Sequence, residues 1–416
     1  MPRVLLVAAT TGYQTSAFAD AARHLGLDLV LATDRCHVLE DPWGDRAIPV
    51  RFDDPYASRD VLIAAGPFYA IVAVADRTTL VASLAAEALG VQYNSPASVE
   101  ACHDKYLSRQ RFEAAGLPVP KFFRVLASAN PLDAAGRMPF PCVLKPLGLS
   151  ASRGVIRANN AVEFEEAFVR IRALLAGVDI AMLREEQNRY IQVESFIEGR
   201  EFALEGLVTA GELQVIAIFD KPDPLDGPFF EETIYVTPSR ASPETQRALI
   251  GAARSAVGAL GLTHGPIHAE LRMQGRGAWV LEVAARPIGG LCARTLQFDG
   301  SVSLEELILR HALGEDVSRV RLSDRASGVM MIPIPSGGGV YQGVEGVEQA
   351  SAIPDVEDVI ITAKEGQKIL PLPEGASYLG FIFARAGTPV RVEQALREAH
   401  ACLRFDMATV LPVMRR

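Results

Sequence analysis

The chain has 416 residues, of which 49% are hydrophobic and 22% are charged, and its formal net charge is −9 at pH 7. This composition is ordinary for a globular enzyme, and the length allows roughly two to four domains. The acidic balance excludes the basic footprint that a nucleic-acid partner needs, so any phosphate binding must be local.

Cysteine usage and the length of apolar runs bear on the cellular compartment. The five cysteines, Cys36 among them, are scattered and form no CxxC pair, which favours a reducing cytosol over zinc or disulfides. The apolar run at residues 4–9 is too short for a secretory signal. No apolar run approaches the roughly 18 residues of a membrane-spanning helix. We therefore expect a cytoplasmic protein without a membrane partner.

Strands and helices alternate in the first part of the chain. Strands are predicted at residues 3–9, 28–32 and 70–75, and helices at residues 15–25, 56–65 and 79–89. Short connections between them indicate a parallel sheet covered on both faces, which is Rossmann-like in outline. The turn at residues 9–12 lacks the glycines of GxGxxG, so we interpret this part as a scaffold that lends a loop to the site.

Two lysines stand out in the next segment. Residues 98–115 suit one helix that contains Lys105, although a lone surface lysine is usually solvated. In the apolar run at residues 139–147, strand alternation places Lys145 on the same face as Val143. A lysine at the end of such a strand costs free energy unless it meets an anion, so we expect an anion beside Lys145.

A loop of small residues and an extended segment follow. Residues 148–155 include Ser150 and Ser152, whose hydroxyls could close over phosphate oxygens together with backbone N–H groups. The loop is not a Walker A loop, because no GK[ST] follows it. Residues 190–199 predict a strand that runs into an extended segment, which could present backbone groups to adenine, while Glu201 could accept from a ribose. Two consecutive strands without a ligand are the alternative.

A predicted hairpin carries the acidic residues of greatest interest. Two alternating runs, at residues 267–273 and 278–285, flank a Gly-Arg-Gly turn. Alternation groups these residues by face: His268, Glu270 and Arg272 on the first strand, and Val280, Glu282, Ala284 and Arg286 on the second. Folding about the turn sets Glu270 directly opposite Glu282.

Facing carboxylates repel each other, so a cation is expected between Glu270 and Glu282. Mg²⁺ suits the position because it takes hard oxygen ligands and is commonly held by one or two carboxylates plus substrate phosphates. Arg286 and the glycines after it add a fixed cation and backbone N–H groups, which favours anion binding. The alternative is an ordinary hairpin whose charged side chains lie on a solvent-exposed face and bind no ligand.

The order of these parts resembles the ATP-grasp superfamily over about residues 96–315. The resemblance implies an α/β protein, with α+β character in its ATP-binding part. It implies a Rossmann-like N-terminal domain at residues 1–95, an ATP-grasp domain at residues 96–320 with a lid at about 120–196, and a C-terminal α/β subdomain at residues 321–416.

The resemblance also implies roles for individual residues in binding ATP. Lys105 and Lys145 would bind the α- and β-phosphates. The loop that contains Ser150, Ser152 and Gly154 would cover the phosphates. Three residues would hold the nucleoside, through the carbonyl of Glu194, the N–H of Ile197 and the side chain of Glu201.

For the metal and the reaction, the resemblance implies that Glu270 and Glu282 bind Mg²⁺, with Mn²⁺ as an alternative ion. Arg286 would stabilise the transferred phosphoryl group and an acyl phosphate. Many family members have Asn where this chain has Ala284, which leaves a second Mg²⁺ one protein ligand short.

Within the superfamily, residues 229–239, the GPIHAE and EVAARPIGG runs, and the segment from about residue 325 resemble the L-amino-acid (dipeptide) ligase branch. In that branch the position of Glu232 faces the amino-acid substrate, and His often stands where this chain has Tyr235. The identity of the amino acid is therefore open.

We interpret the chain as an ATP-dependent carboxylate-amine ligase that forms an amide, in particular a dipeptide, through an acyl phosphate and releases ADP and phosphate. Its expected partners are small carboxylates and amines, and a homodimer is left open. Glu232 is the candidate for the substrate ammonium, and His268 lines the pocket unless it is a satisfied structural histidine. The alternatives are a carboxylase or purine-pathway ATP-grasp ligase, and a nucleotide-binding protein without catalysis.

Overall fold

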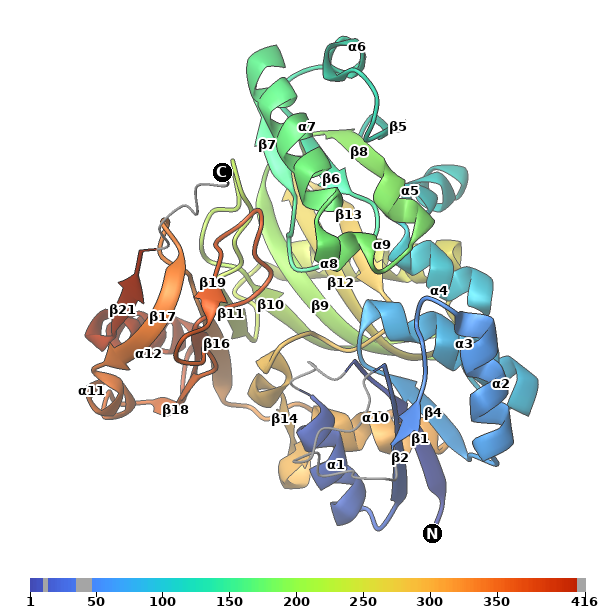
Figure 1. The fold of residues 1–416 in the computed structure, drawn as a ribbon. Helices are drawn as coiled ribbons and strands as arrows, with labels where there is room; N and C mark the ends of the chain where they lie inside the picture. The colour runs from blue at the N-terminus through green and yellow to red at the C-terminus, as the bar shows by residue number, and fades with distance from the viewer. Residues whose placement is uncertain (10–13, 35–46, 410–416) are drawn as a thin grey trace.

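The computed structural model describes residues 1–9, 14–34 and 47–409 (Figure 1). The turn predicted at residues 9–12 lies outside the described residues beyond Ala9, and so does Cys36. The four described cysteines are free thiols. Among the helices of these residues, none has the length and apolarity to cross a membrane.

The N-terminal part is a four-stranded parallel sheet in the order β3-β2-β1-β4, as the alternation of strands and helices predicts. Its elements are β1 (Arg3–Val7), α1 (Thr15–His24), β2 (Asp28–Thr33), β3 (Ile48–Pro49), α2 (Pro55–Ala65), β4 (Ala70–Ala73) and α3 (Thr79–Leu89). Val4 and Leu6 of β1 pack in the same core as α1, while Leu5 and Val7 pack with α2 and α3. Both faces of the sheet are therefore covered, which explains its continuous apolar runs.

The helix predicted at residues 98–115 is in fact two helices, α4 (Pro96–His103) and α5 (Lys105–Ala114). The prediction was wrong because Asp104 leaves the helical conformation and its carboxylate accepts hydrogen bonds from the N–H groups of Tyr106 and Leu107, at 2.8 and 3.0 Å. This is an N-cap, which stabilises a helix start by about 1 kcal/mol. Lys105 thus stands at the first position of a helix.

A separate four-stranded antiparallel sheet, in the order β5-β8-β6-β7, lies above the rest of the molecule in Figure 1. Its elements are β5 (Phe122–Leu126), α6 (Pro131–Ala135), β6 (Cys142–Pro146), β7 (Ile156–Ala158), α7 (Ala161–Leu175), α8 (Val178–Ala181) and β8 (Tyr190–Ser195). Cys142 and Leu144 pack in the core with α7, whereas Val143 and Lys145 line a cavity, as alternation predicts. We refer to this sheet and its helices as the lid.

The largest sheet is antiparallel and has eight strands in the order β13-β12-β9-β10-β11-β16-β20-β18. Its strands are β9 (Arg200–Thr209), β10 (Glu212–Asp220), β11 (Ile234–Thr237), β12 (His264–Gln274), β13 (Gly277–Ala284), β16 (Ala326–Ile332), β18 (Val356–Ile361) and β20 (Gly380–Ala386). Helix α9 (Pro243–Leu260) packs on β9, β12 and β13. Because β11 pairs with β16, one sheet continues from the central part of the chain into the C-terminal part.

The hairpin of β12 and β13 has the predicted register, with Glu270 opposite Glu282. A β-bulge follows, because Leu271 pairs with Val280 and leaves Leu281 as the extra residue. The prediction that Val280 shares a face with Glu282 was therefore wrong. Val280 packs in the core with α9, and Leu281 lines the cavity in its place.

The C-terminal part adds helices and a small second sheet, drawn from orange to red in Figure 1. Its remaining elements are β14 (Gln297–Phe298), β15 (Val302–Ser303), α10 (Leu304–Ala312), β17 (Gly339–Glu345), α11 (Val347–Ser351), β19 (Lys368–Ile369), α12 (Pro389–Cys402) and β21 (Arg404–Ala408). Helix α12 packs on β11, β16 and β20. The opposite face of the large sheet is left to form the floor of the cavity.

Candidate active site

A cavity of about 480 Å³ lies where the lid, the large sheet and the N-terminal part meet. Twelve of the residues singled out from the sequence line it: Lys105, Lys145, Ser150, Ser152, Glu194, Ile197, Glu201, Glu232, His268, Glu270, Glu282 and Arg286. Gly154 does not line it, because its N–H donates to the carbonyl of Pro373 at 2.9 Å. The fold thus brings together segments that are far apart in the sequence.

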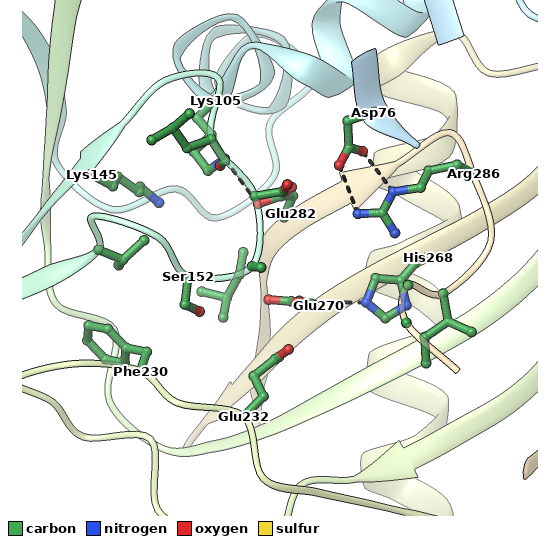
Figure 2. Close-up of a pocket in the computed structure, with 18 of the residues that line it drawn as sticks. Asp76, Lys105, Lys145, Ser152, Phe230, Glu232, His268, Glu270, Glu282 and Arg286 are labelled. Atoms are coloured by element: carbon green, nitrogen blue, oxygen red, sulfur yellow. Dashed lines mark hydrogen bonds and ion pairs between the residues drawn. The ribbon is translucent and has the colours of Figure 1, made fainter. Parts of the chain in front are cut away.

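At the lid end, Lys105 connects three elements. Its ammonium donates to the carbonyl of Leu149 in the small-residue loop at 2.7 Å, and lies 3.5 Å from Oε2 of Glu282. These contacts hold the loop beside β13. In Figure 2 the side chains of Lys105 and Lys145 lie on the same side of the cavity.

Lys145 belongs to a buried cluster at the lid end. Its Nζ lies 2.5 Å from Oε2 of Glu194, and Nε of Arg109 lies 2.7 Å from the other oxygen. Burial lowers the pKa of Lys145 to about 8. Burial opposes ionisation of Glu194, yet Arg109 and Lys145 together lower its pKa to about 2. With two cations on one carboxylate, this end has positive charge to offer an anion.

Lys221 is the centre of a second cluster, at the end of the cavity formed by the large sheet. Its ammonium donates to Glu201 at 2.7 Å and to Glu232, and lies 3.7 Å from Glu270. Burial alone would lower the pKa of Lys221, but the three carboxylates raise it well above its usual range. Four carboxylates at this end, those of Glu201, Glu205, Glu232 and Glu270, contact three cations, Lys221, Arg272 and His268, so this end has negative charge to offer a cation.

Two further side chains, those of Arg272 and Tyr235, contact the carboxylate cluster. Arg272 donates to Glu201 at 2.8 Å and to the carbonyl of Ile197 at 2.8 Å, which holds the segment predicted to meet adenine. The hydroxyl of Tyr235 donates to Glu232 at 2.8 Å. Burial raises the pKa of Glu232, so a cation beside it would favour its ionised form.

The hairpin presents the residues that could hold a metal ion. Glu270 and Glu282 project into the cavity from neighbouring strands in Figure 2. Glu270 also belongs to a group with Glu201 and Glu232, whose carboxylate oxygens lie within 4.8 Å of one another. Carboxylate oxygens in this number fit Mg²⁺ or Mn²⁺ and are a poor match for soft metals.

His268 lies beside these carboxylates on the same strand face. Its Nδ1 is hydrogen-bonded to Glu205, and its Nε2 lies 3.6 Å from Oε1 of Glu270. Burial would lower the pKa of His268, but Glu205 raises it to about 9. The contact with Glu205 thus favours the imidazolium form of His268, which adds positive charge beside Glu270.

Arg286 is held by the N-terminal part of the chain. Its guanidinium donates to both oxygens of Asp76, at 2.9 and 3.0 Å, as Figure 2 shows. Burial opposes ionisation of Asp76, but Arg286 lowers its pKa below the usual range. Asp76 follows β4, and it fixes the orientation of the guanidinium within the cavity.

The N-terminal part and the C-terminal part of the chain both contact the lid. Glu185 of the lid accepts from Nε of Arg77 at 2.7 Å. On the C-terminal side, Glu374 accepts two hydrogen bonds from Arg170, at 2.5 and 2.8 Å, and its carbonyl accepts from Arg153 at 2.9 Å. These contacts tie the lid to the parts of the chain on both sides of the cavity.

Glu205, Lys221, Asp76 and Arg109 are among the site residues that were missed from the sequence. Lys221 directly follows the apolar strand β10, so the argument that singled out Lys145 would have found it. Asp76 lies just beyond the carboxyl end of a parallel strand, where such sheets place ligands. Arg109 has no comparable signal, because a charged residue in a helix is usually solvated.

Comparisons with known protein families agree with this arrangement. Residues 138–295 match a family profile described as an ATP-grasp domain. Residues 306–408 match one described as L-amino acid ligase C-terminal domain 2.

Curated proteins of similar sequence include an uncharacterized protein and an amino-acid ligase, both bacterial. The chain is 27% identical over 304 residues to an uncharacterized protein, y4rH, of Sinorhizobium fredii, covering 73% of this chain and 61% of that protein. It is 27% identical over 238 residues to an alanine–anticapsin ligase of Bacillus subtilis, covering 54% of this chain and 50% of that protein. The chain thus spans about half to three-fifths of the length of these relatives.

Solved structures of similar fold include an L-amino acid ligase from Bacillus licheniformis. It has a TM-score of 0.80 and 26% sequence identity, and the match covers 98% of this chain and 99% of that chain. A phosphoribosylglycinamide synthetase from Anaerococcus prevotii has a TM-score of 0.70 at 15% identity, with 98% and 99% of the two chains covered. At that identity the second likeness indicates the fold alone.

Proposed function

We propose that this chain, whose residues 138–295 match an ATP-grasp domain and whose residues 306–408 match an L-amino acid ligase C-terminal domain, joins the carboxylate of one amino acid to the amine of another with formation of ADP. One observation carries this proposal. Cations outnumber carboxylates at the lid end, whereas at the sheet end four carboxylates outnumber the three cations Lys221, Arg272 and His268, and the hairpin that carries Glu270 and Glu282 lies between the two ends. Such a division suits a polyphosphate at one end and an ammonium group at the other.

The lid end would bind ATP. Lys105 and Lys145 would contact the α- and β-phosphates, and the hydroxyls of Ser150 and Ser152 would close over them. The adenine would lie against apolar lining residues, beside the backbone of Glu194 and Ile197, with Glu201 at the ribose. The apolar lining at this end includes Val143, Val155, Phe196, Phe230 and Leu281.

Glu270 and Glu282 would hold a Mg²⁺ ion, with Mn²⁺ as the alternative. When bound, the ion neutralises charge on the terminal phosphates. The side chain of Ala284 supplies no ligand, so a second ion would depend more on water.

In the first step, an oxygen of the substrate carboxylate attacks the γ-phosphorus, the bond from that phosphorus to the β,γ-bridging oxygen breaks, and ADP leaves. Arg286 would stabilise the transferred phosphoryl group, because its guanidinium is oriented by Asp76. His268, protonated through Glu205, would add to this positive field and would not act as a base.

In the second step, an uncharged amine attacks the carbonyl carbon of the acyl phosphate. The bond from carbon to the phosphate oxygen breaks, the nitrogen passes a proton to the leaving phosphate, and the amide and hydrogen phosphate are the products. Because the attacking amine is uncharged, Glu232 would bind the ammonium of the amino acid whose carboxylate is activated. The closed lid would exclude water and protect the acyl phosphate from hydrolysis.

The proposal is tested by measuring phosphate release with ATP and Mg²⁺ across a matrix of amino-acid pairs, with the product identified by mass spectrometry. We expect at least one pair to give a dipeptide together with equal amounts of ADP and phosphate. ATP turnover that requires bicarbonate or a phosphorylated purine precursor would instead indicate a carboxylase or a purine-pathway enzyme. ATP binding without turnover on any acceptor would contradict catalysis.

A further inference from the structure

Beyond Glu232, the cavity ends at four mainly apolar side chains, Cys292, Met331, Tyr378 and Phe381, which we call the apolar wall. Met331 comes from β16 and Phe381 from β20, so the C-terminal part of the chain supplies much of this surface. None of these residues has a role in the reaction described above.

The apolar wall is a packed surface. Met331 and Phe381 are paired across neighbouring strands, and the Tyr378 ring meets the Phe381 ring edge-on with centroids 6.1 Å apart. A Cβ atom placed on Gly290 would lie 3.2 Å from the Phe381 ring and 3.8 Å from the sulfur of Cys292. The glycine segment that follows Arg286 therefore lies directly against the wall.

The apolar wall is also adjacent to the proposed ammonium site. The N–H of Met331 donates to the carbonyl of Thr233, the residue after Glu232, at 2.8 Å. Burial raises the pKa of Tyr378 well above its usual range, and the Glu232 carboxylate adds to this effect. An amino acid with its ammonium at Glu232 and its carboxylate towards Arg286 would thus direct its side chain to the wall.

The charges around this end determine which side chains fit. Lys221, the cation that contacts Glu232, is already shared by three carboxylates, and Arg286 is held by Asp76. A carboxylate side chain placed against the apolar wall would be buried without a partner, and an ammonium or guanidinium would lose its hydration to apolar groups. An uncharged, apolar side chain meets neither penalty.

We infer that the apolar wall is the specificity subsite for the activated amino acid and selects an apolar side chain. This inference rests on the proposed ligase function, since it needs an amino acid bound at Glu232. Met331 is the residue to test, because its neighbour Met330 faces the other side of the same strand and packs in the core with α12. The two methionines are a matched pair with 3% and 4% of their surface exposed.

The experiment uses the full chain with ATP and Mg²⁺, and hydroxylamine as a common amine that traps the acyl phosphate as a hydroxamate. The acids are L-alanine, L-leucine, L-phenylalanine, L-tryptophan, L-glutamate and L-lysine. Equilibrium binding of the same acids is measured by calorimetry with a non-hydrolysable ATP analogue. Wild type, Met331→Ala and Met330→Ala are compared.

For the wild type we expect kcat/KM for the best apolar acid to exceed that for glutamate and lysine by about tenfold or more. Met331→Ala enlarges the subsite, so the tryptophan-to-alanine ratio of kcat/KM should rise by about tenfold, whereas Met330→Ala should leave that ratio within about twofold. A preference for charged acids would overturn the inference. An equal change of the ratio in both methionine variants would do the same.

The binding measurement separates the two proposals. Binding with the apolar preference but without hydroxamate or phosphate release would support the subsite and contradict the ligase function. Turnover with charged acids alone would support the ligase and contradict the subsite. If no amino acid is bound or turned over, both proposals are wrong.

Discussion

Lys145 lies near the end of β6 and Lys221 directly follows β10, yet the two lysines stand in clusters of opposite charge balance. Each follows a run of apolar residues and each is buried. Lys145 shares the single carboxylate of Glu194 with Arg109, and burial lowers its pKa to about 8. Lys221 is shared by three carboxylates, which raise its pKa well above the usual range. The role of a buried lysine is thus set by the number of carboxylates that the fold brings to it.

This comparison explains why one cavity can accept both a polyphosphate and an ammonium group. A new anion at the lid end finds cations that outnumber the local carboxylate, whereas a new cation at the sheet end finds four carboxylates against the three cations Lys221, Arg272 and His268. The Glu270 and Glu282 hairpin separates the two ends. Changes on either side of it should therefore affect different measurable quantities.

The largest effect is expected on ATP turnover, from replacing Glu282, which lies between the lid end and the sheet end of the cavity. Glu282→Ala should lower ATP turnover by about 10³-fold or more, because the metal ion would lose one of its carboxylates and the terminal phosphates their neutralising charge. Circular dichroism should show an intact fold. ADP release at the wild-type rate would contradict the metal role of Glu282.

Replacing each lysine by methionine should show that Lys221 contributes more to protein stability and that Lys145 contributes more to ATP affinity. Lys221→Met leaves Glu201, Glu232 and Glu270 without their shared cation, so the free energy of unfolding should fall by about 3–5 kcal/mol. Lys145→Met leaves Glu194 paired with Arg109, so stability should fall by only about 1–2 kcal/mol.

For ATP affinity the order of the two variants should reverse. Lys145→Met should raise the Kd for ATP by about 10- to 100-fold, since it removes a charged hydrogen-bond donor from the phosphates. Urea unfolding and nucleotide titration on both variants provide the measurements. Equal stability losses in the two proteins would show that the two clusters do not differ as described.

A smaller effect is expected from pH at the lid end. Lys145 is charged below its pKa of about 8 and neutral above it, so ATP affinity of the free enzyme should fall by about tenfold per unit as the pH rises past 8. Lys145→Arg keeps its charge over this range and should bind ATP with little pH dependence. A decline of the same size in the arginine variant would assign the titration to another group.

The smallest effect is expected at the contact between the lid and the C-terminal part. Glu374→Ala removes a partly exposed ion pair with Arg170, so the free energy of unfolding should change by less than about 1 kcal/mol. The KM for ATP should rise by about two- to threefold because the closed lid is less favoured. The double charge reversal Arg170→Glu with Glu374→Arg should restore it, and failure to do so would argue against a role of this ion pair in lid closure.

Much of the fold follows from local patterns in the sequence. Alternation of strands and helices predicted the parallel N-terminal sheet, and period-two alternation predicted that Lys145 shares a face of its strand with Val143. The hairpin turn set the register that brings Glu270 opposite Glu282. These features depend on backbone geometry and on residues close in sequence, so they can be predicted without the tertiary structure.

Other features depend on partners that are distant in the sequence. Asp76 and Arg286 are 210 positions apart, and Arg109 and Glu194 are 85 apart, so no local pattern pairs them. The bulge at Leu281, which moved Val280 into the core, is likewise a response to packing against α9. The sequence by itself determined which side chains could carry charge into a cavity. Only the tertiary structure decided which charges meet, because electrostatic pairing depends on distances of a few ångströms that packing sets.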